Sequence, residues 1–331
     1  MTKTMDRELD KELDRELQTR AALVTEAIEE LLPVVHPRPL YMASRHLVDA
    51  GGKRLRPSML LLAGQAVGGD AKALAPAAVS IELIHNFTLI HDDIMDNADV
   101  RRGRPAVHKL WGQSGAILAG DTLYSKAFQV LGMTKARPDL ILGAMNMLSK
   151  TCTAICEGQW LDMEFEAKER VSEAEYMEMI EKKTGVLYGA SASMGALLSG
   201  ASPKVVAALD EFGRLTGMGF QLQDDVIDLI TPENVSGKRQ GGDLIEAKKT
   251  LIMIHAFAHD VPVKVFGKKD ATAEQIQEAI SLLEKSGSIE YARSRAEEMV
   301  QKGKRALQVL PDSKEKATLL ELADYMVRRR Y

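Results

Sequence analysis

Apolar residues recur at intervals of three and four through most of this 331-residue chain. This is the repeat of an amphipathic α-helix. Aromatic residues make up only 5% of the chain, and no Asn-Gly or Asp-Gly turn separates two strand-like runs. Glycine and proline interrupt the pattern in clusters too short to be flexible linkers. We therefore predict an all-α fold, a single-domain bundle of long helices.

The N-terminal residues carry a distinct repeat. Between residues 6 and 17, a four-residue unit of one Asp, one basic residue, Glu and Leu occurs three times in succession. Such a charge-rich pattern favours a solvated helical extension. We place this charged N-terminal extension at residues 1–19 and the domain at residues 20–331.

The charge balance excludes some partners. The 43 Lys and Arg residues face 47 Asp and Glu residues, for a formal net charge of −4, whereas nucleic-acid binding usually appears as strong basicity. The N-terminus lacks the apolar stretch of a secretory signal, and the longest weakly polar run, 186–201, is short for a membrane span. Two cysteines fit a reducing compartment. We predict a cytoplasmic protein with no nucleic-acid partner and no membrane span.

The strongest functional signal is an acidic motif that occurs twice. Residues 92–96 and 224–228 both read Asp-Asp-x-x-Asp, each near the expected C-terminal end of an apolar helix. Positions four apart share a helix face, so Asp92 lies with Asp96, and Asp224 lies with Asp228. Like charges there repel unless cations intervene, and clustered carboxylates suit Mg²⁺. One copy alone could be a solvated acidic face, but two copies with the same spacing favour a metal site.

Other side chains extend these two acidic faces. His85 and Thr88 fall close to the direction of Asp92, and Gln221 lies one turn before Asp224. Basic clusters lie elsewhere in the chain, and arginine and lysine are the side chains that bind phosphate oxygens. Members of these clusters include Lys53, Arg56, Arg101, Arg102, Lys183, Lys238 and Lys248. The combination predicts metal-assisted departure of a phosphate-type leaving group.

On these motifs the chain resembles the trans-isoprenyl diphosphate synthases, the farnesyl and geranylgeranyl diphosphate synthase family, and most closely the archaeal short-chain members. The motifs are Gly-Gly-Lys53-Arg54-Leu-Arg56-Pro, the two aspartate motifs, Arg101-Arg102-Gly103, Lys183-Thr184, and Lys238 through Asp243 to Lys248. The resemblance implies a homodimer with a central cleft between helices. It also implies condensation of isopentenyl diphosphate with dimethylallyl, geranyl or farnesyl diphosphate.

The resemblance also assigns roles to residues. Asp92, Asp96, Asp224 and Asp228 would hold two or three Mg²⁺ ions around the allylic diphosphate, with Asp225 in the same catalytic set. Lys53, Arg56, His85 and Arg102 would bind isopentenyl diphosphate. Arg101, Lys183, Lys238 and Lys248 would bind the allylic diphosphate, and Thr184 and Gln221 would face the developing cation.

Product length is the least constrained property. The family limits it with residues just before the first aspartate motif, here Phe87 and Thr88. This arrangement favours geranylgeranyl diphosphate as product, with farnesyl diphosphate second. Helical geometry nevertheless places Phe87 away from the face of Asp92, so its role is inherited from the family.

Three alternatives stay open at this point. An HD-type metal phosphohydrolase would use His85 with His91-Asp92, but it leaves the second aspartate motif and the Lys53–Arg56 cluster unexplained. A class I terpene cyclase shares the first motif and has a different second one. A non-catalytic synthase subunit usually lacks one of the two motifs, and both are present here.

Overall fold

The computed structural model describes residues 2–232 and 239–329, and for residues 2–10 it describes the backbone alone. Two compact units divide the chain. Unit 1 comprises Met1–Cys152, Ala190–Asp210 and Val309–Glu321, and unit 2 comprises Thr153–Gly189, Glu211–Gln308 and Leu322–Tyr331. The helices with residues in both units are α6 (Pro138–Ala167), α8 (Val186–Leu198), α9 (Pro203–Ile230) and α15 (Lys314–Arg328).

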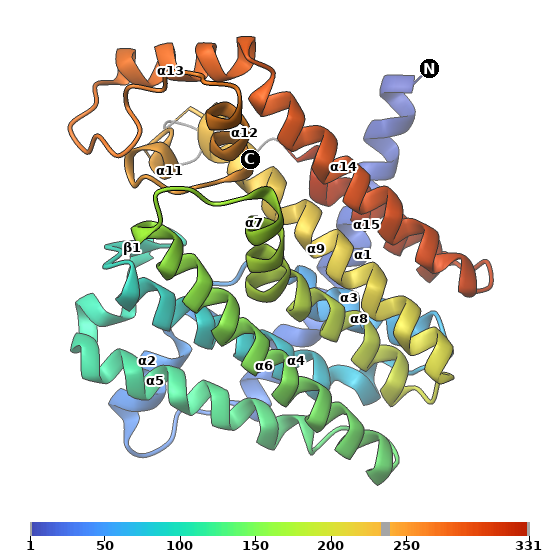
Figure 1. The fold of residues 1–331 in the computed structure, drawn as a ribbon. Coiled ribbons are helices and arrows are strands. Elements are labelled where there is room, and N and C mark those ends of the chain that lie inside the picture. Colours follow the sequence, from blue (N-terminus) through green and yellow to red (C-terminus); the bar gives the residue numbers. More distant parts are fainter. Residues whose placement is uncertain (1, 233–238, 330–331) are drawn as a thin grey trace. The chain divides into compact units, whose positions relative to one another are not determined.

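Unit 1 is built around one apolar helix. Its helices are α1 (Thr2–Leu31), α2 (Arg38–Val48), α3 (Leu55–Gln65), α4 (Ala71–Met95) and α5 (Val107–Leu131) (Figure 1). The side chain of Asp70 caps the start of α4 by accepting a hydrogen bond from the Ala73 N–H at 2.9 Å. Because α4 packs against α1, α2, α3 and α5, it is apolar on most of its circumference.

The apolar character of α4 bears on the predicted absence of a membrane span. By length and composition α4 is long and apolar enough to cross a membrane, and it is the single such helix in residues 2–232 and 239–329. In its most apolar window 67% is buried inside the molecule. Packing against the neighbouring helices therefore accounts for its composition.

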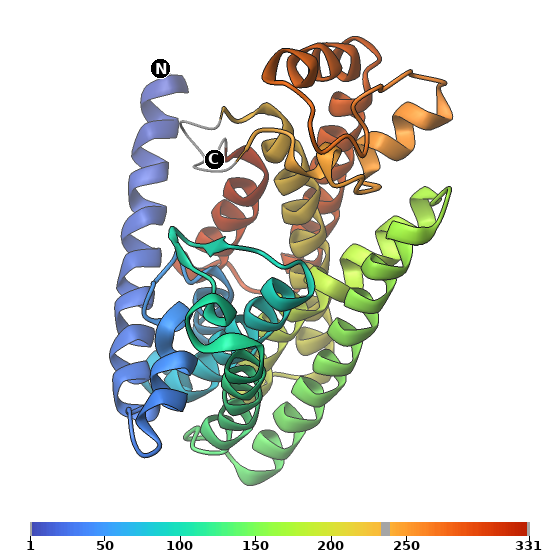
Figure 2. The ribbon, with the colours of Figure 1, turned by 90° about the vertical axis from the view of Figure 1, so that its left-hand side faces the viewer.

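The N-terminal charged repeat continues into the unit without a break. Helix α1 runs as one long helix from Thr2 to Leu31 (Figure 2). Leu13 and Leu17 are buried, and Arg20 donates from Nη2 to Oε1 of Gln65 at 2.8 Å. The prediction of a solvated helix is therefore wrong at Leu13 and Leu17, which lie one turn apart on a buried face of α1.

A small hairpin follows α4, and helical periodicity gave no sign of it. Strands β1 (Val100–Arg101) and β2 (Arg104–Pro105) pair antiparallel, with Val100 opposite Pro105 and Arg101 opposite Arg104. These strands are the whole of the sheet structure in the described residues. The turn uses left-handed backbone at Arg102 and Gly103, with φ of 53° and 71°. The hairpin sets the positions of three arginines just beyond the first aspartate motif.

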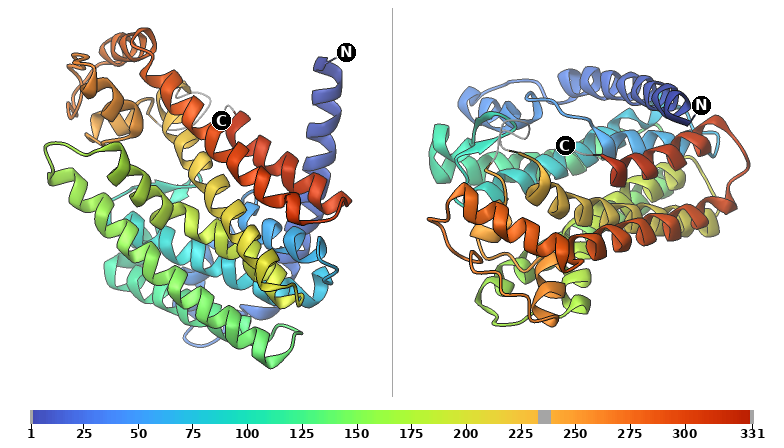
Figure 3. Two further views of the ribbon diagram at one scale, coloured as in Figure 1. Left: turned by 45° about the vertical axis from the view of Figure 1, so that its right-hand side comes forward. Right: turned by 90° about the horizontal axis from the view of Figure 1, so that it is seen from above.

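Unit 2 packs shorter helices against the second half of α9. They are α7 (Glu173–Ile180), the π-helical turn η1 (Glu181–Gly185), α11 (Gly242–Ile245), α12 (Leu251–Ala258), α13 (Ala273–Lys285), α14 (Ser288–Ala306) and the 3₁₀ turn η2 (Leu307–Val309) (Figure 3). Capping boxes at Ser172 and Thr272 satisfy the first N–H groups of α7 and α13. Buried Leu222, Val226 and Ile252 belong to one apolar core.

Candidate active-site residues in each unit

The first aspartate motif lies at the C-terminal end of α4, as predicted. Asp96 is the residue that ends the helix, and its N–H donates to the carbonyl of Asp92 at 2.8 Å. This bond keeps the two residues one helical turn apart on the same face. The Asp96 side chain is exposed and Asp92 is half-buried, so solvent reaches the outer residues of the motif.

The middle aspartate of this motif has a different environment. Asp93 is fully buried, and its Oδ1 accepts a hydrogen bond from Arg101 Nε at 2.8 Å and pairs with Arg101 Nη2 at 2.5 Å. A charge-assisted contact through two nitrogens fixes the plane of the guanidinium. Asp93 was not among the predicted site residues, and the structure makes it the residue that orients Arg101.

His85 lies about two turns before Asp92 on α4, beside Arg56. The Nη1 atom of Arg56 is 3.4 Å from Nε2 of His85. Burial lowers the pKa of His85 well below its usual value, and the charges of Arg56, Arg102, Arg101 and Arg54 lower it further. The imidazole is therefore neutral, with Nε2 accepting from Arg56 and the proton on Nδ1.

Arg102 reaches back from the hairpin to the loop before α3. Its Nη1 donates to the carbonyls of Gly51 at 2.7 Å and Leu47 at 3.1 Å, and to Oδ1 of Asn86 at 3.3 Å. A Cβ atom on Gly52 would lie 3.6 Å from Cζ of Arg102. The predicted basic residues Arg56, His85 and Arg102 are therefore brought together, and Lys53 is exposed in the same loop.

The two predicted chain-length residues have different surroundings. The Phe87 ring makes edge contacts with His91 at 4.8 Å and with Tyr124 of α5 at 5.3 Å between ring centroids. Tyr124 lies 5.3 Å from Phe128 in turn. Thr88 donates to the carbonyl of His85 at 2.8 Å and lies four residues before Asp92. Phe87 thus belongs to an aromatic stack between α4 and α5, while Thr88 shares the helix face of Asp92.

In unit 2, Lys183 and Thr184 lie on the π-helical turn η1. Lys183 Nζ donates to Oδ2 of Asp162 on α6 at 2.6 Å. A Cβ atom on Gly158 would lie 2.3 Å from the backbone nitrogen of Lys183, so only glycine allows α6 to approach this turn so closely. Single π turns of this kind are frequent at functional sites.

A chain of hydrogen bonds connects Thr184 to the second aspartate motif. Thr184 Oγ1 donates to Oε1 of Gln221 at 3.0 Å, and Gln221 Nε2 donates to Oδ1 of Asp225 at 3.0 Å. The hydroxyl of Tyr176 donates to the other oxygen of Asp225. Asp225 is buried, and both of its carboxylate oxygens accept hydrogen bonds from protein donors. Its contact with Gln221 fixes the orientation of the Gln221 side-chain amide.

The outer aspartates of the second motif also have partners. Asp224 forms an ion pair with Arg329, whose Cζ lies 3.8 Å from the centre of the Phe220 ring. Oδ2 of Asp228 accepts from the N–H of Asp243 at 3.0 Å. Lys248 lies 3.6 Å from Asp243. The remaining predicted cation of this group, Lys238, falls outside the described residues.

Burial and neighbouring carboxylates raise the pKa of two acidic residues near this motif. The pKa of Asp225 is raised well above its usual value by burial, then by Asp243. Burial also raises the pKa of Asp243, and Glu246 and Asp162 raise it further against the opposing effect of Lys248. Both shifts favour the protonated acid, since burial disfavours the charged carboxylate.

Whether these residues suit a metal ion depends on the side chains that could ligate it. In the described residues, no three His, Cys, Asp or Glu side chains converge as a self-sufficient metal site. Mg²⁺ does not require one, since it is usually held by one or two carboxylates together with substrate phosphates. The i, i+4 aspartate pairs of α4 and α9 fit this mode of binding.

Three partners that position the predicted residues were missed by the sequence reasoning. Asp93 lies inside a motif of which only the outer aspartates were assigned a role. Tyr176 and Arg329 are 49 and 105 residues from their partners in the sequence. Of the three, only Asp93 gave a signal in the sequence, since an aspartate in a buried apolar helix needs a cationic partner. Nothing local in the sequence links Tyr176 or Arg329 to α9.

The described residues thus combine carboxylates, which suit divalent cations, with arginines and lysines, which suit phosphate oxygens. The chain matches the family model described as polyprenyl synthetase over residues 37–283. It is 56% identical over 314 residues to the geranylgeranyl diphosphate synthase of Methanosarcina mazei, covering 95% of this chain and 97% of that protein. It is 46% identical over 328 residues to the geranylfarnesyl diphosphate synthase of Natronomonas pharaonis, with 94% and 96% covered. The solved geranylgeranyl pyrophosphate synthetase from Geoglobus acetivorans superposes with a TM-score of 0.90 at 46% identity, with 95% and 99% covered.

The chain therefore belongs to the polyprenyl synthetase family, as a trans-isoprenyl diphosphate synthase of the archaeal short-chain type. The predicted prenyltransferase class and the all-α isoprenoid synthase fold are confirmed. Membership over most of the chain sets aside the HD-type phosphohydrolase and the terpene cyclase, and the enzyme class sets aside a non-catalytic subunit. The central cleft and the boundary at residue 19 stay predictions.

Proposed function

We propose that the enzyme condenses isopentenyl diphosphate with allylic diphosphates, from dimethylallyl to farnesyl, and that geranylgeranyl diphosphate is its main product. Farnesyl diphosphate is the second candidate. The observation that carries the proposal is that both aspartate motifs are intact near helix ends, and that Asp93 and Asp162 hold Arg101 and Lys183 beside them. The names of the two curated relatives support a product of 20 or 25 carbons.

The proposed roles of the residues follow from their charges. Asp92, Asp96, Asp224 and Asp228 would hold two or three Mg²⁺ ions, which stabilise negative charge on the leaving diphosphate when bound. Arg101, Lys183, Lys238 and Lys248 bind the allylic diphosphate, and their charges stabilise the anion as its C–O bond breaks. Asp93 and Asp162 keep Arg101 and Lys183 in position, through the contacts described above.

Isopentenyl diphosphate is bound by Lys53, Arg56, His85 and Arg102. The neutral His85 can donate from Nδ1–H to a phosphate oxygen while Nε2 accepts from Arg56. The double bond of isopentenyl diphosphate attacks the allylic cation, a carbon–carbon bond forms, and a proton passes to the released diphosphate. Thr184 and Gln221 face the cation with oxygen atoms whose orientation Asp225 fixes.

Product length is set by the aromatic stack of α4 and α5. Phe87 is held by His91 and Tyr124, and Phe128 supports Tyr124 in turn. A ring packed on two sides cannot swing aside to admit a longer chain. The tail of the growing product would extend from Asp92 past Thr88 and would stop against Phe87.

We also propose that the enzyme is a cytoplasmic homodimer without a nucleic-acid partner. Leu110, Ile117 and Leu118 of α5 are exposed by 51%, 45% and 57%. Such large apolar side chains gathered on one helix of unit 1 suit burial against a second copy. Sedimentation velocity of the wild type and of Leu118→Glu tests the dimer, which the charged variant should dissociate.

The experiment that tests the proposed reaction is product analysis. The protein is incubated with isopentenyl diphosphate, dimethylallyl diphosphate and Mg²⁺, and the dephosphorylated products are separated by chain length. We expect geranylgeraniol as the main alcohol and farnesol as the minor one. A product of 25 carbons would correct the length alone, whereas an absence of any elongated product would refute the proposed reaction.

A further inference from the structure

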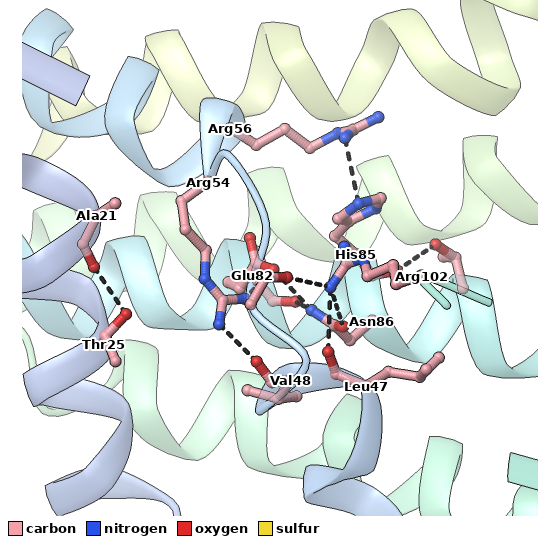
Figure 4. Close-up of polar contacts among 12 residues, drawn as sticks. Ala21, Thr25, Leu47, Val48, Arg54, Arg56, Glu82, His85, Asn86 and Arg102 are labelled. Carbon is pink, nitrogen blue, oxygen red and sulfur yellow. Dashed lines mark hydrogen bonds and ion pairs between the residues drawn. The ribbon is translucent and has the colours of Figure 1, made fainter. Parts of the chain in front are cut away.

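Two neighbouring polar residues of α4, Glu82 and Asn86, lie buried among the basic residues of unit 1. Their side chains are 2% and 0% exposed, respectively. Figure 4 shows Arg54 and Arg102 approaching them from opposite sides, one from the loop before α3 and one from the hairpin. Neither Glu82 nor Asn86 has a role in the proposed reaction described above.

Glu82 neutralises Arg54. The two form a buried ion pair, and Arg54 Nη2 also donates to the carbonyl of Val48 at 2.6 Å. A buried ion pair with such additional bonds fixes a backbone segment more than it stabilises the fold. Here the segment is the left-handed residue before α3, where Arg54 has φ of 48°, between Lys53 and Arg56.

Glu82 also fixes the orientation of Asn86. The Asn86 Nδ2 donates to Oε1 of Glu82 at 2.7 Å and to the Glu82 carbonyl at 2.8 Å. Because the amide nitrogen is engaged by two acceptors, the amide oxygen must point the other way. That oxygen is the one that accepts from Arg102 at 3.3 Å.

Arg102 is consequently held by neutral oxygens. Its acceptors are the carbonyls of Leu47 and Gly51 and the amide of Asn86. Burial lowers the pKa of Arg102, Glu82 opposes this shift, and Arg54, Arg101 and Arg56 add to it. Neutral acceptors position a guanidinium without cancelling its charge, which leaves that charge for an incoming anion.

We infer that Asn86, oriented by Glu82, is a positioning residue for isopentenyl diphosphate, because it holds Arg102 in place with its positive charge uncancelled. The inference rests on the proposed function, which assigns Arg102 to that substrate. An aspartate at position 86 would replace the neutral acceptor of Arg102 with a charged one, and it would lose the Nδ2 donor whose hydrogen bonds Glu82 accepts. The type of acceptor, and not its presence alone, is therefore the feature that serves binding.

The test compares Asn86→Asp with Asn146→Asp. Asn146 lies exposed on α6 in unit 1, so its variant adds the same charge away from the arginines. We expect Asn86→Asp to raise the KM for isopentenyl diphosphate roughly 10- to 100-fold, because the added carboxylate cancels the charge of Arg102 that the diphosphate would meet. The kcat and the KM for farnesyl diphosphate should stay within about threefold, and Asn146→Asp should match the wild type.

A purely structural role gives a different pattern. If Asn86→Asp lowers the melting temperature and changes kcat and both KM values together, or leaves the KM for isopentenyl diphosphate unchanged, the inference is wrong. Should that variant not fold, Asn86→Ser decides, because it removes the bond without adding charge. It should raise the same KM roughly three- to tenfold and no other constant. Failure of the wild type to elongate any allylic diphosphate would refute the proposed function instead.

Discussion

The two aspartate motifs have the same five-residue pattern and different surroundings. In unit 1 the middle residue, Asp93, is neutralised by the cation Arg101. In unit 2 the middle residue, Asp225, is held by the neutral donors Tyr176 and Gln221, and its pKa is raised. The same pattern thus combines outer aspartates that can bind a ligand with a middle one that orients a neighbour, Arg101 in one case and Gln221 in the other.

The outer aspartates should be the most sensitive positions. Asp92→Asn and Asp224→Asn each remove a charged oxygen that the account assigns to the metal, and kcat/KM should fall by about 100- to 1000-fold in each. Circular dichroism should show that both variants keep their helix content. Activity within about tenfold of the wild type in both would contradict the assignment of these residues to the metal.

The middle aspartates should differ from one another in stability. Asp93→Asn leaves Arg101 without its buried counter-charge, and breaking such a pair costs about 3 kcal/mol. Asp225→Asn keeps an oxygen that accepts from Tyr176 and removes a charge that burial disfavours, so it should cost less than about 1 kcal/mol. Thermal melts in metal-free buffer compare the two, and equal losses would contradict the difference in surroundings.

Phe87 should change the product and leave turnover largely intact. Phe87→Ala removes the ring that His91 and Tyr124 hold, so the product distribution should shift toward 25 carbons or longer. Phe128→Ala, one step further along the stack, should shift it less because Phe87 stays in place. An unchanged distribution with Phe87→Ala would remove the role that the family suggests for this residue.

The smallest expected effect is a pH dependence at His85. The folded state disfavours the charged imidazole, while the unfolded chain takes up a proton as the pH falls below about 6.5. Stability from this residue is therefore complete above that pH and decreases as the pH falls through it. His85→Gln should have a flatter stability profile between pH 7 and 5 than the wild type. Parallel profiles would show that His85 does not titrate on unfolding.

Short-range features of the fold were predictable from the sequence. The helical repeat gave the all-α class, and the position of both motifs near helix ends was right, at Met95 and Ile230. The i, i+4 relation of Asp92 and Asp96 also followed from helix geometry alone. These features depend on residues within a few turns of each other, which a sequence pattern records directly.

The features that the sequence pattern missed depend on contacts between distant residues or on one extra residue in a helical turn. The π turn that carries Lys183 and Thr184 differs from an α-helix by one residue, and apolar periodicity does not register it. The contacts of Tyr176 with Asp225 and of Arg329 with Asp224 join separate helices. The hairpin at residues 100–105 is too short for a strand pattern.

Counting bound metal most directly tests whether the outer aspartates of both motifs hold the cations. Mn²⁺, as a spectroscopic substitute for Mg²⁺, can be titrated by electron paramagnetic resonance in the presence of inorganic pyrophosphate. The wild type should bind two or three ions per chain, and Asp92→Asn and Asp224→Asn should each bind fewer. Asp225→Asn, the matched control from within a motif, should bind as many as the wild type. Undiminished binding by both outer variants, or a loss confined to Asp225→Asn, would contradict the account.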